Sequence, residues 1–148
     1  MYLSPAWFKF LLNIYPPYLG AGIKVEQIHE DWYGIRVSMK LRWYNRNAVH
    51  VHFGGSLYSM VDPHLMLMHM QLLGKDFIVW DKAASISFIR PGKGKVTADF
   101  MLTKKDIEKV IEKTCNGKVF EPTYDIEIKN EKGKVVARVT KELYIKRK

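Results

Sequence analysis

A long, mostly apolar stretch, Gly54 to Leu73, constrains the fold of this chain more than any other feature. Two glycines open it, Asp62 is its only carboxylate, Pro63 follows, and Gly74 is a plausible helix stop. A helix that is apolar on every side has to be buried. The sequence therefore predicts a buried central helix, kinked at Pro63 because proline removes a backbone donor.

Segments that alternate between apolar and polar residues surround this helix, as expected for half-buried strands. The clearest alternation places Ile35, Val37, Met39, Leu41 and Trp43 on one face. The predicted strands cover residues 23–33, 35–44, 77–90, 95–103, 119–129 and 134–145. Thr103 with Asp106 predicts the start of a short helix that Gly117 ends. An antiparallel sheet wrapped around the buried helix is an α+β fold. The length predicts a single domain, 1–148, in which residues 1–22 form an N-terminal helical extension.

The composition narrows the possible partners. A net charge of +9 favours anionic partners: nucleic acid, membrane lipid or a phosphorylated small molecule such as coenzyme A. No helix-turn-helix, zinc site or base-stacking motif is recognisable, so we expect no nucleic-acid partner. The single cysteine, Cys115, excludes an intrachain disulfide and fits a reducing, cytoplasmic location.

The N-terminal residues are apolar but do not resemble a signal peptide, because they lack a basic start and Lys9 interrupts them. No apolar run reaches the length of about 18 residues that spans a bilayer, so we expect no stable membrane insertion. We expect the N-terminal helix to pack on the domain or on a partner, and contact with a membrane surface remains an alternative.

The candidate site residues lie within one short stretch of the sequence: Asn47, Gly54, Gly55 and Asp62. Glycines at a helix start let another group approach the N–H donors at the positive helix end. Asp62 lies about two turns further along. A lone carboxylate in an apolar run has to be paired, neutralised or functional.

This spacing resembles that of hotdog-fold thioesterases. Their phenylacetyl-CoA thioesterase-like branch has Asn, a spacer, His-Gly-Gly, and Asp seven residues after the second Gly. The chain is more similar to the DUF4442-type branch, in its Gly-Gly helix, its Asp62-Pro63 step, and segments 79–84 and 88–91. The resemblance implies a hotdog fold from about Leu19 onward.

The resemblance also implies a chemistry, hydrolysis of an acyl-CoA-type thioester. In the related enzymes the carboxylate matching Asp62 acts as general base or nucleophile, and the N–H matching that of Gly54 polarises the thioester carbonyl. Asn47 would hold that carbonyl or orient water across a subunit boundary. The site would lie between the subunits of a homodimer or dimer of dimers, with coenzyme A present only as part of the substrate and no cofactor.

Each of these residues has a structural alternative. Asp62 could cap backbone groups freed by Pro63, the glycines could serve helix–sheet packing, and Asn47 could be a turn former. Phe53 stands where the family has His, and His50 or His52 would have to replace it from another direction. This departure supports an alternative function, a non-catalytic acyl-CoA or fatty-acyl binding protein.

Further candidates surround this set. Asp81 and Lys82 interrupt an apolar strand, either facing substrate or forming an ion pair that fixes the sheet. Arg90, beside a turn, could bind coenzyme A phosphates or be solvated. The predicted substrate-binding residues are Gly55, Phe53, His52, Asp81, Lys82 and Arg90. His64 could tune the pKa of Asp62, but His64 and His69 are wrongly spaced for a metal, and we expect none.

Overall fold

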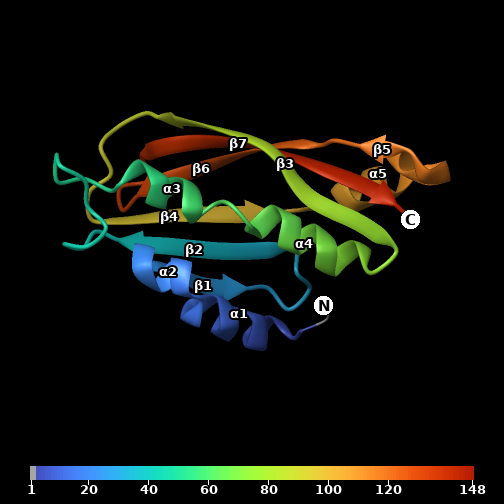
Figure 1. Cartoon of the computed structure of the whole chain (residues 1–148), viewed down its shortest axis with the longest axis horizontal. Helices are drawn as coiled ribbons and strands as arrows, with labels where there is room; N and C mark the ends of the chain where they lie inside the picture. Colours follow the sequence, from blue (N-terminus) through green and yellow to red (C-terminus); the bar gives the residue numbers. More distant parts are fainter. Residues whose placement is uncertain (1–2) are drawn as a thin grey trace.

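The computed structural model, which describes residues 3–148, contains one curved antiparallel sheet with helices on its concave side (Figure 1). The strand order is β1-β2-β4-β6-β7-β3, and a short β5 pairs with β7. The strands are β1 (Ile23–Ile28), β2 (Gly34–Lys40), β3 (Phe77–Phe88), β4 (Lys95–Met101), β5 (Val119–Phe120), β6 (Thr123–Asn130) and β7 (Val135–Arg147).

The central apolar stretch forms two helices, α3 (Gly54–Ser59) and α4 (His64–Leu73). The expected kink at Pro63 is therefore a break: the chain leaves the helix after Ser59 and resumes at His64. Proline supplies no backbone N–H, so the helical hydrogen-bond ladder cannot run unbroken through this position. The break separates the two halves of the predicted helix and places Asp62 between them.

The core lies between these two helices and the sheet. Fully buried side chains of α3, α4 and the break pack against the concave faces of β2, β4 and β7. The largest of these core side chains are Met39, Met60, Leu65, Met68, Phe100, Leu143 and Ile145. The predicted α+β arrangement, an antiparallel sheet around a central helical stretch, is confirmed.

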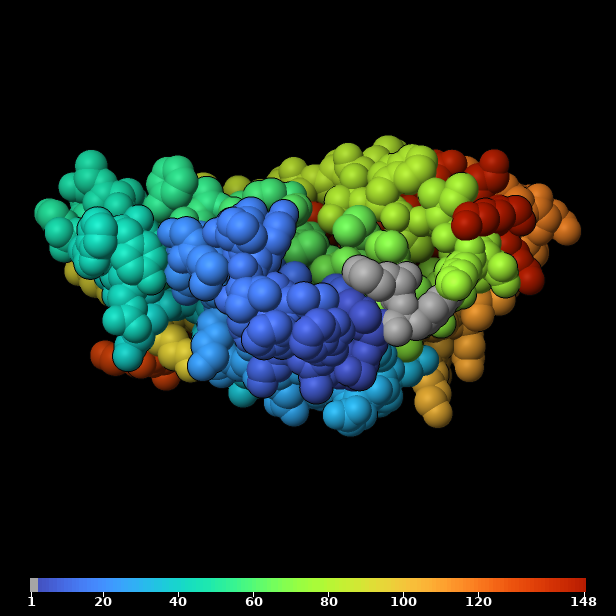
Figure 2. Space-filling model, turned by 60° about the horizontal axis from the view of Figure 1, so that its bottom comes forward, coloured from blue at the N-terminus to red at the C-terminus, as the bar shows by residue number. Residues whose placement is uncertain are grey.

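The N-terminal residues form α1 (Pro5–Ile14) and α2 (Pro16–Ala21), which lie against β1 at one edge of the sheet (Figure 2). Phe8 and Tyr18 are buried beneath them. The Asn13 amide exchanges two hydrogen bonds with the backbone of Val25, at 2.8 and 3.0 Å. These bonds occupy part of the open edge of β1, which would otherwise attract another strand.

Several predicted strands end earlier than expected, most clearly the strand predicted over residues 23–33, which ends at Ile28, and the one predicted over residues 35–44. β2 ends at Lys40, and Trp43, predicted to face the core, is 79% exposed. The Asn45 side chain explains this, because it accepts from the N–H of Arg42 and donates to the carbonyl of Lys40, bonds that turn the chain. The strand predicted from residue 119 is split into β5 and β6, with Pro122 between them.

The helix α5 (Lys104–Lys113) begins with the predicted capping box of Thr103 and Asp106. It ends before Gly117, which closes a short 3-10 turn, η1 (Cys115–Gly117). Within residues 3–148, no helix is both long enough and apolar enough to cross a membrane.

The edge strand β3 is the most open part of the sheet. It pairs with β7 on one side only, and most of its residues are exposed or half-buried. Its second half includes Phe88, which is exposed. An exposed strand edge of this length is a template for pairing with another strand.

Candidate active site

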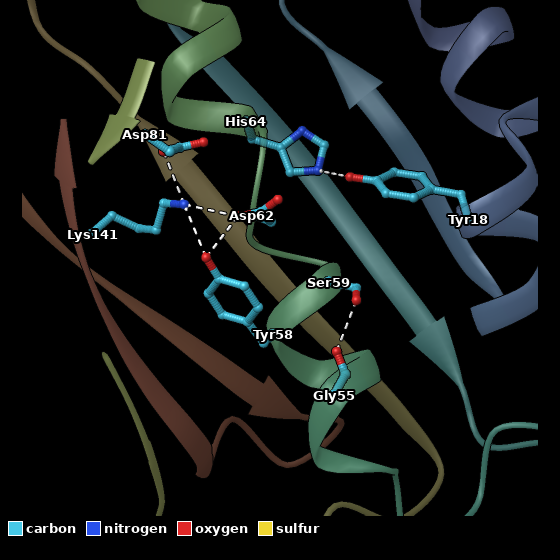
Figure 3. Close-up of polar contacts among 8 residues, drawn as sticks. All are labelled: Tyr18, Gly55, Tyr58, Ser59, Asp62, His64, Asp81 and Lys141. Carbon is cyan, nitrogen blue, oxygen red and sulfur yellow. Dashed lines mark hydrogen bonds and ion pairs between the residues drawn. The ribbon is translucent and has the colours of Figure 1, made fainter. Parts of the chain in front are cut away.

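The break between α3 and α4 brings Asp62 to a cluster of polar side chains (Figure 3). The Tyr58 hydroxyl, one helical turn earlier, donates to Asp62 Oδ1 at 2.7 Å. The Lys141 ammonium of β7 donates to the same oxygen at 3.0 Å. The second carboxylate oxygen, Oδ2, has no hydrogen-bond partner among residues 3–148, and the side chain is 47% exposed.

Lys141 is the centre of this cluster. Its side chain is fully buried, and Nζ lies 2.9 Å from Asp81 Oδ1, 3.0 Å from Asp62 Oδ1 and 3.4 Å from the Tyr58 hydroxyl. Asp81 stands opposite Leu143 in the β3–β7 pairing, which places its side chain on the inward face. Removing a lysine from water is costly unless carboxylates surround it, and here two do.

These contacts determine the protonation states of Asp62, Asp81 and Lys141. Burial raises the pKa of Asp62, but the hydrogen bonds from Tyr58 and Lys141 outweigh it and hold the pKa below its usual value. Burial lowers the pKa of Lys141, and the two carboxylates more than offset this. Burial dominates at Asp81, whose pKa is raised. At neutral pH, Asp62 is thus an ionised carboxylate beside a protonated lysine.

A cavity of about 460 Å³ opens beside this cluster. Its lining consists of Tyr58, Lys141 and residues 81–86 of β3. Tyr58, Asp81 and Lys141 thus line the cavity, and Asp62 is bound to two of them. A molecule in the cavity would lie along the exposed edge strand.

His64 lies behind Asp62, directly after Pro63. It is fully buried, and the Tyr18 hydroxyl of α2 is 2.7 Å from its Nε2. Burial lowers the pKa of His64 to about 3, so the ring is neutral at pH 7. Tyr58 and Lys141 lower the pKa of Asp62 more than His64 does, so the predicted influence of His64 on this pKa is small.

Gly54 and Gly55 are the first two residues of α3, whereas Asp62 lies beyond its other end; Figure 3 shows Gly55 at the end away from Asp62. A Cβ added to Gly54 would lie 2.9 Å from the Phe88 ring, and a Cβ added to Gly55 would lie 2.6 Å from the Phe53 ring. Close packing thus accounts for both glycines. The Gly54 N–H has no acceptor in the part of the chain that the structure describes, as expected for the first turn of a helix.

Gly54 lines a second cavity, of about 410 Å³. Asn47, His52 and Arg90 also line it. The Asn47 side chain accepts from the N–H groups of Val49 and Val51, so it is the turn former of its loop.

His52 is 2% exposed rather than on the surface, and its Nε2 is 2.9 Å from the Gly94 carbonyl. Its Nδ1 has no partner within residues 3–148. The Arg90 guanidinium donates to the Val135 carbonyl.

The predicted site residues therefore fall into two groups. Asp62 and Asp81 meet at Lys141, whereas Asn47, His52, Gly54 and Arg90 surround the second cavity. Gly55 and Phe53 stand between them at the start of α3, where the Phe53 ring is 56% exposed.

Lys82 does not pair with Asp81. It is the extra residue of a β-bulge and binds Glu121 and Glu142 at 2.7 and 3.0 Å on the outer face. Its backbone still lies along the first cavity. No group of three or more His, Cys, Asp or Glu side chains that could hold a metal occurs among the described residues.

Sequence reasoning missed Lys141 and Tyr58. Lys141 occupies an inward position of β7 between Val139 and Leu143, and a charge at such a position is a signal for a buried partner. Tyr58 precedes Asp62 by four residues, the spacing at which helical side chains meet.

The curved sheet around a broken central helix, with a carboxylate at the break, defines a hotdog-fold protein. The solved structure of PA5026 from Pseudomonas aeruginosa, a protein of unknown function described as a probable thioesterase, is similar over 100% of this chain and 99% of that one, with a TM-score of 0.85 and 18% identity. The thioesterase HI1161 from Haemophilus influenzae is similar over 99% and 93%, with a TM-score of 0.68 and 18% identity. A protein with unknown function from Chlorobaculum tepidum, OLEI01261, is similar over 99% and 98%, with a TM-score of 0.75 and 16% identity.

Residues 5–145 match the family described as domain of unknown function DUF4442. The chain belongs to this family. Comparison with curated proteins finds no match.

Proposed function

We propose that this protein hydrolyses acyl-CoA-type thioesters at a site between two subunits, with Asp62 as the reacting carboxylate. The observation that carries the proposal is the state of Asp62: ionised, half exposed, and held by its Oδ1 so that Oδ2 faces away from its partners. The descriptions of PA5026 and HI1161 as thioesterases support the reaction class.

Asp62 suits either of two roles. As a general base, Oδ2 takes a proton from a water that attacks the thioester carbonyl, the C–S bond breaks, and the proton goes on to the leaving thiolate. As a nucleophile, Oδ2 attacks the carbonyl itself, the C–S bond breaks as the thiolate leaves, and water opens the resulting anhydride, regenerating the Asp62 carboxylate and supplying the proton that the thiolate takes up. Both roles need the ionised form, which Tyr58 and Lys141 maintain. Either route ends with the carboxylic acid and the free thiol, and Lys141 keeps its own proton throughout because its pKa is raised.

The oxyanion donor comes from the other subunit in this proposal. Gly54 and Asp62 of one chain lie at opposite ends of segment 54–62: Gly54 starts α3, which rises about 7.5 Å from Gly54 to Ser59 at about 1.5 Å per residue, and Asp62 lies three residues beyond its end. An attacking atom and an oxyanion donor both have to lie about 3 Å from the same carbonyl. A second copy paired along the open edge of β3 in antiparallel orientation would bring its Gly54 end toward the Asp62 end of the first.

The substrate would then extend along β3 across both cavities. Its acyl part would lie near Tyr58 and Ala84 in the first cavity. Its phosphates would approach Arg90 at the second cavity, which Asn47 and His52 also line.

A second candidate function, acyl-CoA or fatty-acyl binding without catalysis, is favoured by Phe53. Its exposed ring covers Gly55 where related enzymes place a histidine, so an apolar group replaces a polar one beside the carbonyl. Saturable binding of acyl-CoA with no thiol release would select this function.

The first test is thiol release from a panel of acyl-CoA esters, acetyl to palmitoyl and phenylacetyl, by wild type and Asp62→Asn. We expect the substitution to lower kcat at least 100-fold, within the range of losses for removed acid–base groups. An Asp62→Asn variant that keeps full turnover would refute the role of the carboxylate.

The second test isolates the Gly54 N–H. Gly54→Pro removes it, and proline is tolerated at the first helical position when the preceding residue is extended, as Phe53 is with ψ of 130°. Gly54→Ala is the matched control, because it places the same Cβ against Phe88 but keeps the N–H. We expect Gly54→Pro to lose much more activity than Gly54→Ala.

Mixing Gly54→Pro with Asp62→Asn then tests the shared site. If the two groups act from different subunits, hybrid dimers regain one intact site, and activity rises above that of either variant alone. No recovery on mixing, with exchange of subunits verified, would refute the shared site.

A further inference from the structure

The N-terminal helix α1 is apolar on its outer face as well as on its inner one. Phe8 is buried against the domain, whereas Trp7, Phe10 and Ile14, on the opposite side, are each about half exposed. The Trp7 and Phe10 rings stack on each other at 5.3 Å. Lys9 is the only charged residue of this helix. A helix on a water-facing surface normally carries polar residues on its outer face. The apolar outer face of α1 departs from this pattern and is typical of a surface that contacts another apolar phase or molecule.

More exposed apolar groups continue this face. Leu19 of α2 is exposed, and the segment after β2 adds Trp43 and Tyr44. Asn45 of that segment donates to the carbonyl of Ala21 at 3.0 Å, which joins the segment to the end of α2. Figure 2 shows α1, α2 and this segment side by side on one face. We call Trp7, Phe10, Ile14, Leu19, Trp43 and Tyr44 the N-terminal aromatic surface.

The helices and the segment that carry this surface have basic but no acidic residues. The acidic side chains between them in sequence are Glu26, Glu30 and Asp31, and Asp31 precedes Trp32, whose ring contacts Phe8 on the inner face of α1. Residues 1–25 and 32–61 contain no aspartate or glutamate. Arg42 and Arg46, on either side of Trp43 and Tyr44, are exposed. An apolar, tryptophan- and tyrosine-bearing surface bordered by basic side chains complements the headgroup region of an anionic bilayer.

A second copy of the chain fits this surface poorly. Two copies of the same face would place basic residues against basic residues with no acidic partner within these segments. The surface also lies on β1, at the opposite end of the strand order from the open edge of β3. Pairing along β3 therefore leaves it uncovered.

We propose that the N-terminal aromatic surface docks the protein onto anionic phospholipid membranes, lying in the headgroup region without crossing it. The proposal does not depend on the proposed hydrolysis. Trp7, Phe10 and Ile14 enter the interface, and Arg42 and Arg46 bind lipid phosphates beside them.

The test is co-sedimentation with vesicles of phosphatidylcholine alone and of phosphatidylcholine with phosphatidylglycerol. Wild type should bind the anionic vesicles more tightly, and added salt should weaken the binding. Phe10→Ser/Ile14→Ser should lower the partition by roughly 25-fold, since each half-exposed side chain contributes on the order of five-fold. Ile111→Ser/Val119→Ser, at 44% and 45% exposure on α5 and β5, is the matched control and should bind as wild type does.

A second variant guards against misfolding. Arg42→Gln/Arg46→Gln changes only exposed side chains and should lose roughly 25-fold on anionic vesicles, about five-fold per charge, and little on neutral ones. Three results would overturn the proposal: no binding of wild type to anionic vesicles, equal losses in the Ile111/Val119 control, or binding to a DNA duplex but not to vesicles. A fall in oligomer mass with Phe10→Ser/Ile14→Ser, with vesicle binding unchanged, would assign the surface to a second copy instead.

Discussion

Lys141→Met tests whether the buried lysine holds the Asp62 site together. The substitution keeps a long side chain in β7 but removes the charge that Asp62 and Asp81 share at 3.0 and 2.9 Å. Breaking a buried pair on one side costs about 3 to 5 kcal/mol, because a charge is left uncompensated. Asp62 is half exposed and regains water, so we expect the lower end, about 3 kcal/mol, at pH 7.

The assay is thermal and urea unfolding followed by circular dichroism. For a chain of 148 residues, about 3 kcal/mol corresponds to a fall in Tm of roughly 10 °C. Lys82→Met is the matched control, because Lys82 also meets two carboxylates, but on the exposed face. Exposed pairs contribute little, so its Tm should stay close to that of wild type.

The pH dependence gives the sharper check. The pKa of Asp62 is lowered in the folded protein, so its pairing stabilises above the unfolded pKa, near 4, and this stabilisation is lost as pH falls through the folded value. The pKa of Lys141 is raised, so its contribution is complete below about 10.5 and is lost only as pH rises further. The deficit of Lys141→Met should thus be largest from neutral pH to about pH 9 and shrink as pH falls. Asp81, whose pKa is already raised by burial and which loses Lys141, takes up a proton first, and Asp62 follows below about pH 4. A variant as stable as wild type at pH 7, or a deficit unchanged at pH 3.5, would refute the reasoning.

Two further predictions concern the contact between Tyr18 and His64, which lies behind Asp62. Tyr18→Phe removes the hydroxyl that pairs with buried His64 and should lower the free energy of unfolding by about 1 to 2 kcal/mol in urea titrations, whereas exposed Tyr15→Phe should change nothing measurable. Because the folded pKa of His64 is lowered to about 3, the unfolded chain binds a proton that the folded one does not, and stability should fall as pH drops from about 6.5 toward 3 by up to about 1.4 kcal/mol per unit. His64→Gln should flatten this decline, and an unchanged slope would contradict the assignment.

The fold was predictable because local and global signals agree. The apolar stretch from Gly54 can only be buried, and the alternating segments can only pair around it. The end of β2 was predicted wrongly because a short polar side chain determines the backbone there. Alternation continues through Trp43, but the Asn45 amide bonds the backbone at Lys40 and Arg42 and ends β2 first.

The site was predictable only in part, because its charges come from distant segments. Asp62 stands out in sequence as a lone carboxylate, but its partner Lys141 is 79 residues away and lies beside it because the break between α3 and α4 packs on β7. Lys141 is a charged residue at a position of β7 where the alternating pattern predicts an apolar one. This indicates a buried partner but does not identify the carboxylate. Roles for Asn47, Gly54 and Asp81 depend on a second subunit and a substrate, and they stay predictions.

The Asp62-Pro63 dipeptide determines both the break in the central helix and the exposure of the site carboxylate. An unbroken helix through this region would keep Asp62 among Met60 and Val61, which are fully buried, and a carboxylate there would be neutralised or would destabilise the core. The break at Pro63 lets the backbone leave the helix, so that the carboxylate turns to half exposure while Lys141 still reaches one of its oxygens. The residue that interrupts the core helix is therefore the residue that makes an ionised Asp62 compatible with a buried core.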